Sequence, residues 1–330
     1  MQIGIRINGR AYTWDEAFAE AQNPLRPWQW TPDLLDLMMV DYSDPDREPG
    51  IESFTPTRLM TCHRQAVLME RHDYYADADL DYPKTRGHMI HALMEKARYP
   101  GAVGYARERR MRHTIATPDF GPQLFTAKPD LIVLKHIELN EEPETFNRDT
   151  GVATPAQTKV HAYLKVVDYK SKNGIKHELT SVPRDNELQV NMYGWLVSQN
   201  PTVYEHGEPI GPVTSLFGLP DTTQLVVDEL EIVYADMAKV RMFSSMGYRT
   251  DRGKRLNRSA PYQYEQLSLA PIHHYTNEQI GRFIIRRMEE RLRAKAPGQL
   301  PACEYVNTER EYLCNWCPVK QLCQSLDVGQ

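Results

Sequence analysis

Apolar residues recur every three or four positions in four segments of the chain, and this spacing predicts four helices. The first begins at Thr55-Pro56-Thr57, where a hydroxyl residue able to cap a helix precedes a proline suited to the first turn, and it is predicted to reach about His72. Cys62 is expected one to two turns into this helix. The other three helices are predicted at about residues 85–98, 183–198 and 277–296.

Shorter apolar stretches predict strands between and after these helices. The strands are expected at about residues 110–117, 124–134, 160–169, 213–218 and 224–234, whereas residues 140–157 and 249–275 are expected to be loop or irregular. This order of helices and strands favours one mixed α/β core. We therefore expect a single domain over residues 53–330, which includes a C-terminal segment from about residue 297.

The first 52 residues are expected to form a separate appendage, irregular or partly helical, because they contain five prolines. They hold ten acidic side chains and four arginines, which leaves 35 basic and 34 acidic residues in the rest of the chain. The formal net charge of −5 therefore resides in this appendage. Two roles stay open for it, recruitment of a partner or masking of a binding channel.

Basic side chains gather in three clusters outside the appendage. They are Arg107, Arg109, Arg110 and Arg112; Arg249, Arg252, Lys254, Arg255 and Arg258; and Arg282, Arg286, Arg287, Arg291, Arg293 and Lys295. Local positive charge can hold a phosphate backbone even when the net charge is negative. A solvated helix face with interspersed glutamates explains the third cluster equally well, so this pattern carries little weight alone.

The cysteine count and the hydropathy of the chain indicate its compartment. Five cysteines in 330 residues are too few and too clustered for a secreted disulfide framework. The chain shows no charged-then-apolar leader and no apolar run of roughly 20 residues that could span a bilayer. We therefore expect a soluble, cytoplasmic protein in a reducing environment, without membrane association.

Three of the cysteines form a Cys-x2-Cys-x5-Cys pattern at Cys314, Cys317 and Cys323. Four thiolates usually hold an iron–sulfur cluster or a structural zinc, and Cys62 is available as the fourth. Cys303 lies outside the pattern and is expected to be a free buried thiol, with a substitute ligand as the alternative. A zinc ribbon usually has two Cys-x2-Cys pairs, which this pattern lacks, but a zinc site stays open beside the cluster.

A second group of polar residues has the composition of a metal-dependent phosphodiesterase site. Asp168 and Lys170 are two apart on a predicted strand and so share a face, and Asp130 stands at the start of an apolar strand upstream. Carboxylates suit Mg²⁺ or Mn²⁺, and a lysine beside them can position or activate water. On the predicted helices, Gln189 and Tyr193 are spaced i, i+4 and share a face. His91 offers an imidazole that can bind Mn²⁺.

Each of these residues alone has a commoner explanation. An Asp-x-Lys pair is usually an exposed ion pair, a Pro-Asp pair is usually a turn, and a helix histidine is usually half-buried and satisfied. Gln189 and Tyr193 would ordinarily be a surface pair. What favours a site is their order along the chain, bracketed by one early and three late cysteines.

In this order of motifs the chain resembles the PD-(D/E)XK nucleases, specifically the RecB-like iron–sulfur exonucleases. These include the CRISPR-associated protein four family, AddB-type nuclease domains and many phage exonucleases. The matching motifs run from Cys62 to Cys323, with Asp168 at a position where glutamate is common. The resemblance implies an α/β restriction-endonuclease-like fold, with a mixed central sheet flanked by helices and a cysteine-bound metal cluster joining the N- and C-terminal parts.

The resemblance also implies roles for the candidate residues. Lys170 would be the catalytic lysine, and Gln189 with Tyr193 would steady the lysine and the substrate. The ligands of Mg²⁺ or Mn²⁺ would be His91, Asp130, Asp168 and the carbonyl of Tyr169. The ligands of a [4Fe–4S] cluster would be Cys62, Cys314, Cys317 and Cys323.

Together these features predict a Mg²⁺- or Mn²⁺-dependent DNA exonuclease that acts on single-stranded ends. Its setting would be phage or bacterial recombination, replication or CRISPR spacer processing, with a partner protein, in a bacterial or phage-infected cell. One alternative is a non-catalytic iron–sulfur subunit that binds DNA ends or a partner protein. Another is a zinc-stapled structural protein in which the Asp-x-Lys pair is surface charge.

Overall fold

A computed structural model describes most of the chain. The described residues are 2–23, 30–39, 53–78, 102–142, 145–147, 152–154, 157–172, 180–236, 241–244, 270–296, 300–306 and 311–327, together with Gly87, His91, Lys96 and Thr308. Among them, no helix combines the length and the apolar character needed to cross a membrane.

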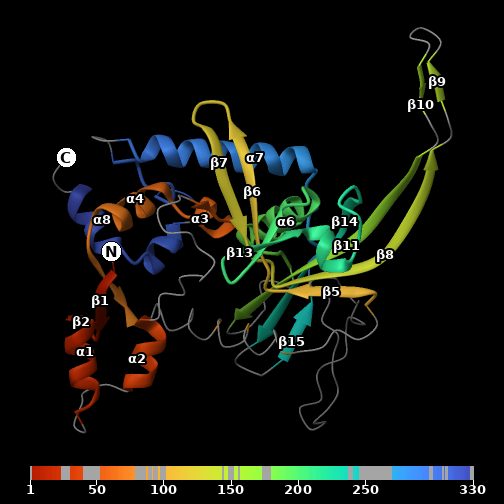
Figure 1. Cartoon of the computed structure of the whole chain (residues 1–330). Helices are drawn as coiled ribbons and strands as arrows, with labels where there is room; N and C mark the ends of the chain where they lie inside the picture. Colours follow the sequence, from red (N-terminus) through yellow and green to blue (C-terminus); the bar gives the residue numbers. More distant parts are fainter. Residues whose placement is uncertain are drawn as a thin grey trace.

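A five-stranded mixed sheet forms the centre of the molecule, in the order β15-β14-β11-β8-β5. Its strands are β5 (Gly104–Arg107), β8 (Leu131–Glu142), β11 (Gln157–Lys172), β14 (Gln224–Asp236) and β15 (Arg241–Ser244). β11 and β14 are parallel, and the other neighbours are antiparallel. Because parallel strands need a crossover connection, α6 (Arg184–Ser198) joins β11 to β14 and packs on both (Figure 1).

The largest core lies between this sheet, α6, α7 (Asn277–Ala294) and a second sheet ordered β13-β12-β6-β7-β3. The second sheet consists of β3 (Ser53–Phe54), β6 (Arg110–Thr117), β7 (Gly121–Ala127), β12 (Thr202–Glu205) and β13 (Glu208–Pro212). Leu164 and Val166 of β11, Met192 of α6 and Ile284 of α7 are fully buried in this core. The removal of their apolar surface from water is the main force that fixes α6 and α7 over the sheets.

Several sequence predictions are confirmed by this architecture. β6 matches the strand predicted at residues 110–117, and α6 and α7 match the helices predicted at 183–198 and 277–296 within two residues. β11 and β14 contain the strands predicted at 160–169 and 224–234 and extend beyond them. A capping box at Thr276 and Gln279 marks the start of α7.

The helix predicted from Thr55 to His72 is wrong in one respect, because it is broken into α3 (Pro56–Met60) and α4 (His63–Arg71). Thr55 does cap the first helix, since its side chain accepts a 3.2 Å hydrogen bond from the backbone of Arg58. Thr61 and Cys62 then adopt ψ values of 139° and 129°, which no helix tolerates. Cys62 therefore stands at the break, as the N-cap residue of α4, and not within a helix.

The strand predicted at residues 124–134 is also two elements, because Lys128-Pro129-Asp130 separates β7 from β8. Pro129 has no N–H to donate to a sheet ladder. Asp130 directly precedes β8, as predicted. The region 140–157, predicted to be a loop, contains the ends of β8 and β11 and two short strands, β9 (Thr145–Asn147) and β10 (Val152–Thr154), so that a long hairpin projects from the body (Figure 1).

The strand predicted at residues 213–218 is wrong, because Val213–Phe217 form the 3-10 helix η1. The hairpin of β12 and β13 before it was not predicted. Its turn places His206 and Gly207 at φ values of 51° and 87°, the left-handed pair that tight hairpins favour. Most of the predicted helix at 85–98 and of the irregular region at 249–275 lies outside the described residues, although Gly87 and His91 are helical.

The N-terminal appendage is more ordered than predicted. It contains β1 (Gln2–Ile7), β2 (Arg10–Thr13), α1 (Trp14–Ala21) and α2 (Pro32–Met39), and a separate apolar core that includes Ile5 and Leu35. β4 (Tyr74–Asp77) completes the sheet β2-β1-β4, and Ala78 packs into the same core. The appendage is thus anchored on the chain beyond residue 52 (red in Figure 1).

The described chain ends in the 3-10 helix η2 (Glu311–Trp316) and helix α8 (Lys320–Asp327). α8 packs beside α4, which also contacts α7 (Figure 1). Segments about 250 positions apart in the sequence therefore meet at the break before α4.

Candidate active site and cysteine pocket

Asp168 and Lys170 lie on the face of β11 that α6 covers, because alternate residues of a strand share a face with Val166 of the core. The Lys170 ammonium is 3.1 Å from Asp168 Oδ1 and 2.9 Å from Oδ2. It also donates a 3.0 Å hydrogen bond to Gln189 Oε1. Asp168 is only 1% exposed, so this Asp-x-Lys pair is not the exposed ion pair that such a motif usually forms.

α6 supplies the second half of this arrangement. Gln189 Nε2 donates a 2.6 Å hydrogen bond to the hydroxyl of Tyr193, one helical turn further along. Burial raises the pKa of Tyr193 well above its ordinary value, and the nearby carboxylates of Asp168 and Asp130 raise it further. The predicted i, i+4 pair thus forms a half-buried chain of hydrogen bonds, in which Tyr193 orients Gln189 and Gln189 orients the ammonium of Lys170.

Asp130 is fixed at the end of the β8–β11 ladder. Its Oδ2 accepts a short hydrogen bond from the backbone N–H of Tyr169, and its Oδ1 is 3.1 Å from Nδ1 of His91. Burial disfavours the charged imidazole, but the bonds to Asp130 and Glu108 outweigh this and raise the pKa of His91 to about 10. Three predicted residues from three segments are therefore brought together: His91, Asp130 and the backbone of Tyr169.

The electrostatics of Asp168 are those of a carboxylate held for a cation. Burial raises its pKa to about 6; Lys170 opposes this shift and Asp130 adds to it. Both of its oxygens lie close to Lys170 Nζ, at 3.1 Å and 2.9 Å. A buried carboxylate charge is costly unless positive charge compensates it, and a divalent cation would add to the compensation that Lys170 supplies. Carboxylate and imidazole donors fit Mg²⁺ or Mn²⁺.

Glu108 belongs to the same site and was missed by the sequence analysis. One ligand atom each from His91, Glu108 and Asp130 lies within 4.8 Å of the others. Glu108 escaped notice because it stands among Arg107, Arg109 and Arg110, so that its surroundings were interpreted as a basic cluster. The available signal was its place two residues before a predicted strand.

The basic clusters are largely paired within the protein. In the third cluster, arginines of α7 contact carboxylates, for example Arg286 with Glu290 and Arg287 with Glu304. This agrees with a helix face of mixed charge. In the first cluster, Arg109 pairs with Glu205 and Arg112 lies 3.9 Å over the ring of Tyr204. The second cluster lies outside the described residues.

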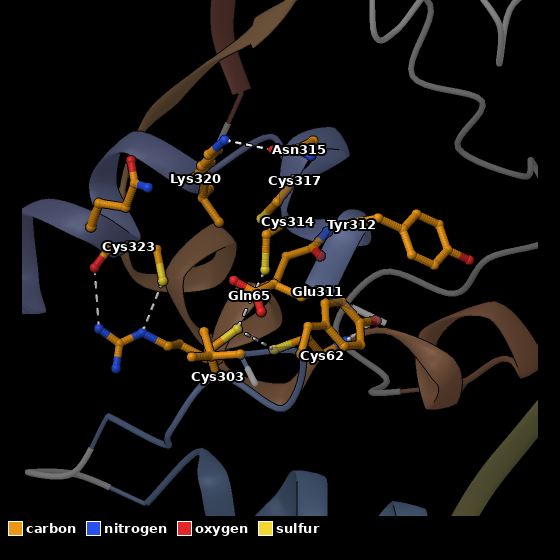
Figure 2. Close-up of a pocket in the computed structure, with 15 residues that line it drawn as sticks. Cys62, Gln65, Cys303, Glu311, Tyr312, Cys314, Asn315, Cys317, Lys320 and Cys323 are labelled. Atoms are coloured by element: carbon orange, nitrogen blue, oxygen red, sulfur yellow. Dashed lines mark hydrogen bonds between the residues drawn. The ribbon is translucent and has the colours of Figure 1, made fainter. Parts of the chain in front are cut away.

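All five cysteines line one pocket of about 280 Å³ between α4, the 300–306 segment, η2 and α8 (Figure 2). None forms a disulfide. Cys303 Sγ lies 4.0 Å from Cys62 Sγ and 3.9 Å from Cys314 Sγ, so this extra cysteine shares the pocket. Burial raises the pKa of Cys62, and it raises the pKa of Cys314 to about 11 and of Cys317 to about 12. Gathered, unoxidised thiols are a donor set that fits a soft metal centre.

Hydrogen bonds from distant residues define the shape of the cysteine pocket. Arg64 is 6% exposed and donates to Cys323 Sγ at 3.1 Å and to the carbonyls of Cys323 and Pro301 at 3.2 Å. Tyr305 accepts from the backbone N–H of Cys62 and donates to the carbonyl of Met60. Arg287 donates to the carbonyls of Leu59 and Thr61. The helix break at Cys62 exists because these partners use the backbone groups that a continuous helix would need.

A comparison with known protein families identifies the family of this chain. Residues 156–324, just over half of the chain, match the family model of the PD-(D/E)XK nuclease superfamily. The chain belongs to this superfamily. PD-(D/E)XK nucleases use divalent metals, so membership indicates a metal-dependent nuclease that acts on DNA. The match covers Asp168, Lys170 and the three late cysteines, and it begins after Asp130.

Other comparisons are less close. No curated protein matches the chain. A solved structure described as "Crystal structure of SSO0001" shares 11% sequence identity, with a TM-score of 0.40 over 84% of this chain and 88% of that chain.

Proposed function

We propose that this PD-(D/E)XK nuclease is a Mg²⁺- or Mn²⁺-dependent DNA exonuclease that hydrolyses phosphodiester bonds at single-stranded ends. The observation that supports it is the half-buried contact of Lys170 with Asp168 and Gln189, beside the His91–Asp130 pair. Phosphodiester hydrolysis needs an activated water and neutralisation of the charge that develops on phosphate oxygens. A bound divalent cation supplies both.

The side chains would divide the work as follows. His91, Asp130 and Asp168, with the Tyr169 carbonyl, would bind the cation. Lys170 holds its positive charge beside the place of the attacking water, and its two acceptors leave the ammonium little freedom to turn away. Gln189 fixes the ammonium and Tyr193 fixes Gln189, so the helix motif acts by positioning.

The cysteine pocket is proposed to hold a [4Fe–4S] cluster on Cys62, Cys314, Cys317 and Cys323. Support comes from the gathering of the thiols around one pocket and from the spacing of the three late cysteines. Thiolates are the usual ligands of such clusters. Because the ligands come from α4 and the C-terminal segment, metal binding would couple to folding, and the role is structural.

The test is cleavage of an end-labelled single-stranded oligonucleotide by anaerobically purified protein, with Mn²⁺ or with EDTA. Lys170→Ala should lower kcat by at least ~100-fold, because a positioned group at the reacting water contributes about that much. Its affinity for DNA, measured in EDTA, should change far less. Lys159→Ala is the matched control, since Lys159 is an exposed lysine of the same strand and should cleave normally.

The outcomes separate the candidate functions. Metal-dependent shortening that Lys170→Ala lacks supports the nuclease, and resistance of circular single-stranded DNA assigns exonuclease action. If folded wild-type protein binds DNA ends but leaves them intact in Mn²⁺, the proposal is wrong and the non-catalytic DNA-end-binding subunit replaces it. Strand preference and a role in recombination or CRISPR spacer processing rest on the family resemblance and need this activity first.

A further inference from the structure

We propose that Glu108 is a further side-chain ligand of the divalent cation, next to His91 and Asp130. This inference rests on the proposed nuclease function and adds a residue to its site. Its support comes from the position, the backbone and the contacts of Glu108.

The sheet register brings Glu108 to Asp130. β5 and β8 are antiparallel with Arg107 opposite Leu131, so the next pair beyond the end of β5 is Glu108 and Asp130. The backbone N–H of Glu108 indeed donates a 3.3 Å hydrogen bond to the carbonyl of Asp130. Both carboxylates reach the same imidazole, because Nδ1 of His91 lies 3.5 Å from Glu108 Oε1 and 3.1 Å from Asp130 Oδ1.

The backbone of Glu108 is in a conformation that glutamate rarely adopts. Its φ is 50°, in the left-handed region, which costs a residue other than glycine on the order of 1 kcal/mol. Strain of this kind persists where surrounding structure imposes it, and it gathers at functional sites. Here it ends β5 and leaves the carboxylate beside His91.

The Glu108 carboxylate is half-buried and contacts two cationic or imidazole side chains. Oε1 is 3.5 Å from His91 Nδ1 and Oε2 is 2.9 Å from Lys128 Nζ, with the Glu108 side chain 12% exposed. Nearby, the buried carboxylate of Asp168 lies 2.9 Å from Lys170 Nζ through its Oδ2.

A purely structural ion pair with Lys128 explains these features less well. The Lys128 side chain is 40% exposed, so its attraction for Glu108 is screened by water. The attraction within such a pair is too weak to offset the free-energy costs of both the buried carboxylate and the strained backbone. Shared ligation of a cation with His91 and Asp130 does, because the hard oxygen donors then face a double positive charge.

The experiment measures Mn²⁺ affinity of the full chain by calorimetry, independent of cleavage. Glu108→Gln keeps the shape and removes the charge, and it should weaken Mn²⁺ binding at least ~10-fold, since even partners outside the ligand shell contribute that much. Lys128→Ala is the matched control. It removes the other half of the ion pair and should leave Mn²⁺ affinity unchanged or slightly higher, because a positive charge near the cation is lost.

The controls distinguish failure of this inference from failure of the nuclease. Asp130→Asn should lose Mn²⁺ binding, and circular dichroism should show all variants folded. If Asp130→Asn loses Mn²⁺ while Glu108→Gln binds it like wild type, Glu108 is only a partner of Lys128 and the nuclease proposal stands. If wild-type protein binds no Mn²⁺ at all, the proposed function itself is overturned.

Discussion

At the scale of one residue, burial of Asp168 in the proposed metal site lowers the stability of the fold. Its carboxylate is 1% exposed and its pKa is raised to about 6 by burial, from an ordinary value of 3.8. Because the fold binds the proton more tightly than the unfolded chain does, stability falls as pH rises from about 4 to about 6 and stays lower above that. The proposed role of Asp168 as a metal ligand needs the ionised form that the fold disfavours.

Asp168→Asn should therefore stabilise the metal-free protein at pH 8 while it abolishes cleavage. The expected gain is on the order of 1–3 kcal/mol, from a pKa difference of about two units, and it should shrink toward pH 5. The amide oxygen of the substituted side chain can still accept a hydrogen bond from Lys170. Urea unfolding in EDTA at the two pH values measures the effect. A variant less stable than wild type at both pH values would show that the ion pair with Lys170 outweighs the cost of burial.

At the scale of elements, the sequence predicts those helices and strands that a local hydrophobic periodicity determines. The strand that carries Asp168 and Lys170 and the helix after Pro183 were predictable, because period-2 and period-3.6 patterns fix which side chains share a face. The contact between Lys170 and Gln189 was implied only by the family resemblance. The break at Cys62 was not, because apolar spacing continues through it and its cause lies in Arg287 and Tyr305, more than 220 positions away. Glu108 was hidden in a run of arginines, and its pairing with Asp130 depends on strand register, which a local pattern does not fix.

The break between α3 and α4 gives a prediction about the cysteine pocket. Cys62→Ser should lose bound iron and the broad absorbance near ~400 nm that distinguishes a brown iron–sulfur protein from a colourless zinc protein. Cys303→Ser should retain both, because Cys303 lies outside the family spacing although its sulfur is 4.0 Å from that of Cys62. Iron analysis and spectra of anaerobically purified variants decide this. Equal loss in the two variants would make Cys303 a ligand, and a colourless wild type would favour zinc.

At the scale of the whole molecule, negative charge is concentrated in the N-terminal appendage. The first 52 residues carry ten acidic side chains against four arginines, whereas the rest is nearly neutral. Their apolar core incorporates Ala78, and β1 pairs with β4, so the acidic unit is attached to the chain just after α4. Deletion of residues 1–52 would remove β1, the strand that pairs with β4, and would disturb folding. A test of masking must instead change charge and leave the core residues Leu35 and Met38 in place.

Neutralising six acidic residues between positions 33 and 48, while Leu35 and Met38 are kept, provides that test. The substitutions are Asp33→Asn, Asp36→Asn, Asp41→Asn, Asp44→Asn, Asp46→Asn and Glu48→Gln. If the acidic unit repels DNA from the site, cleavage of single-stranded ends should accelerate on the order of 10-fold at low salt, and the gain should vanish near ~0.5 M salt, where the Debye length is only a few ångströms. Initial rates at the two salt concentrations measure this. Unchanged rates at low salt would end the masking hypothesis and leave partner recruitment as the role of the acidic unit, because its charge would then have no effect on DNA.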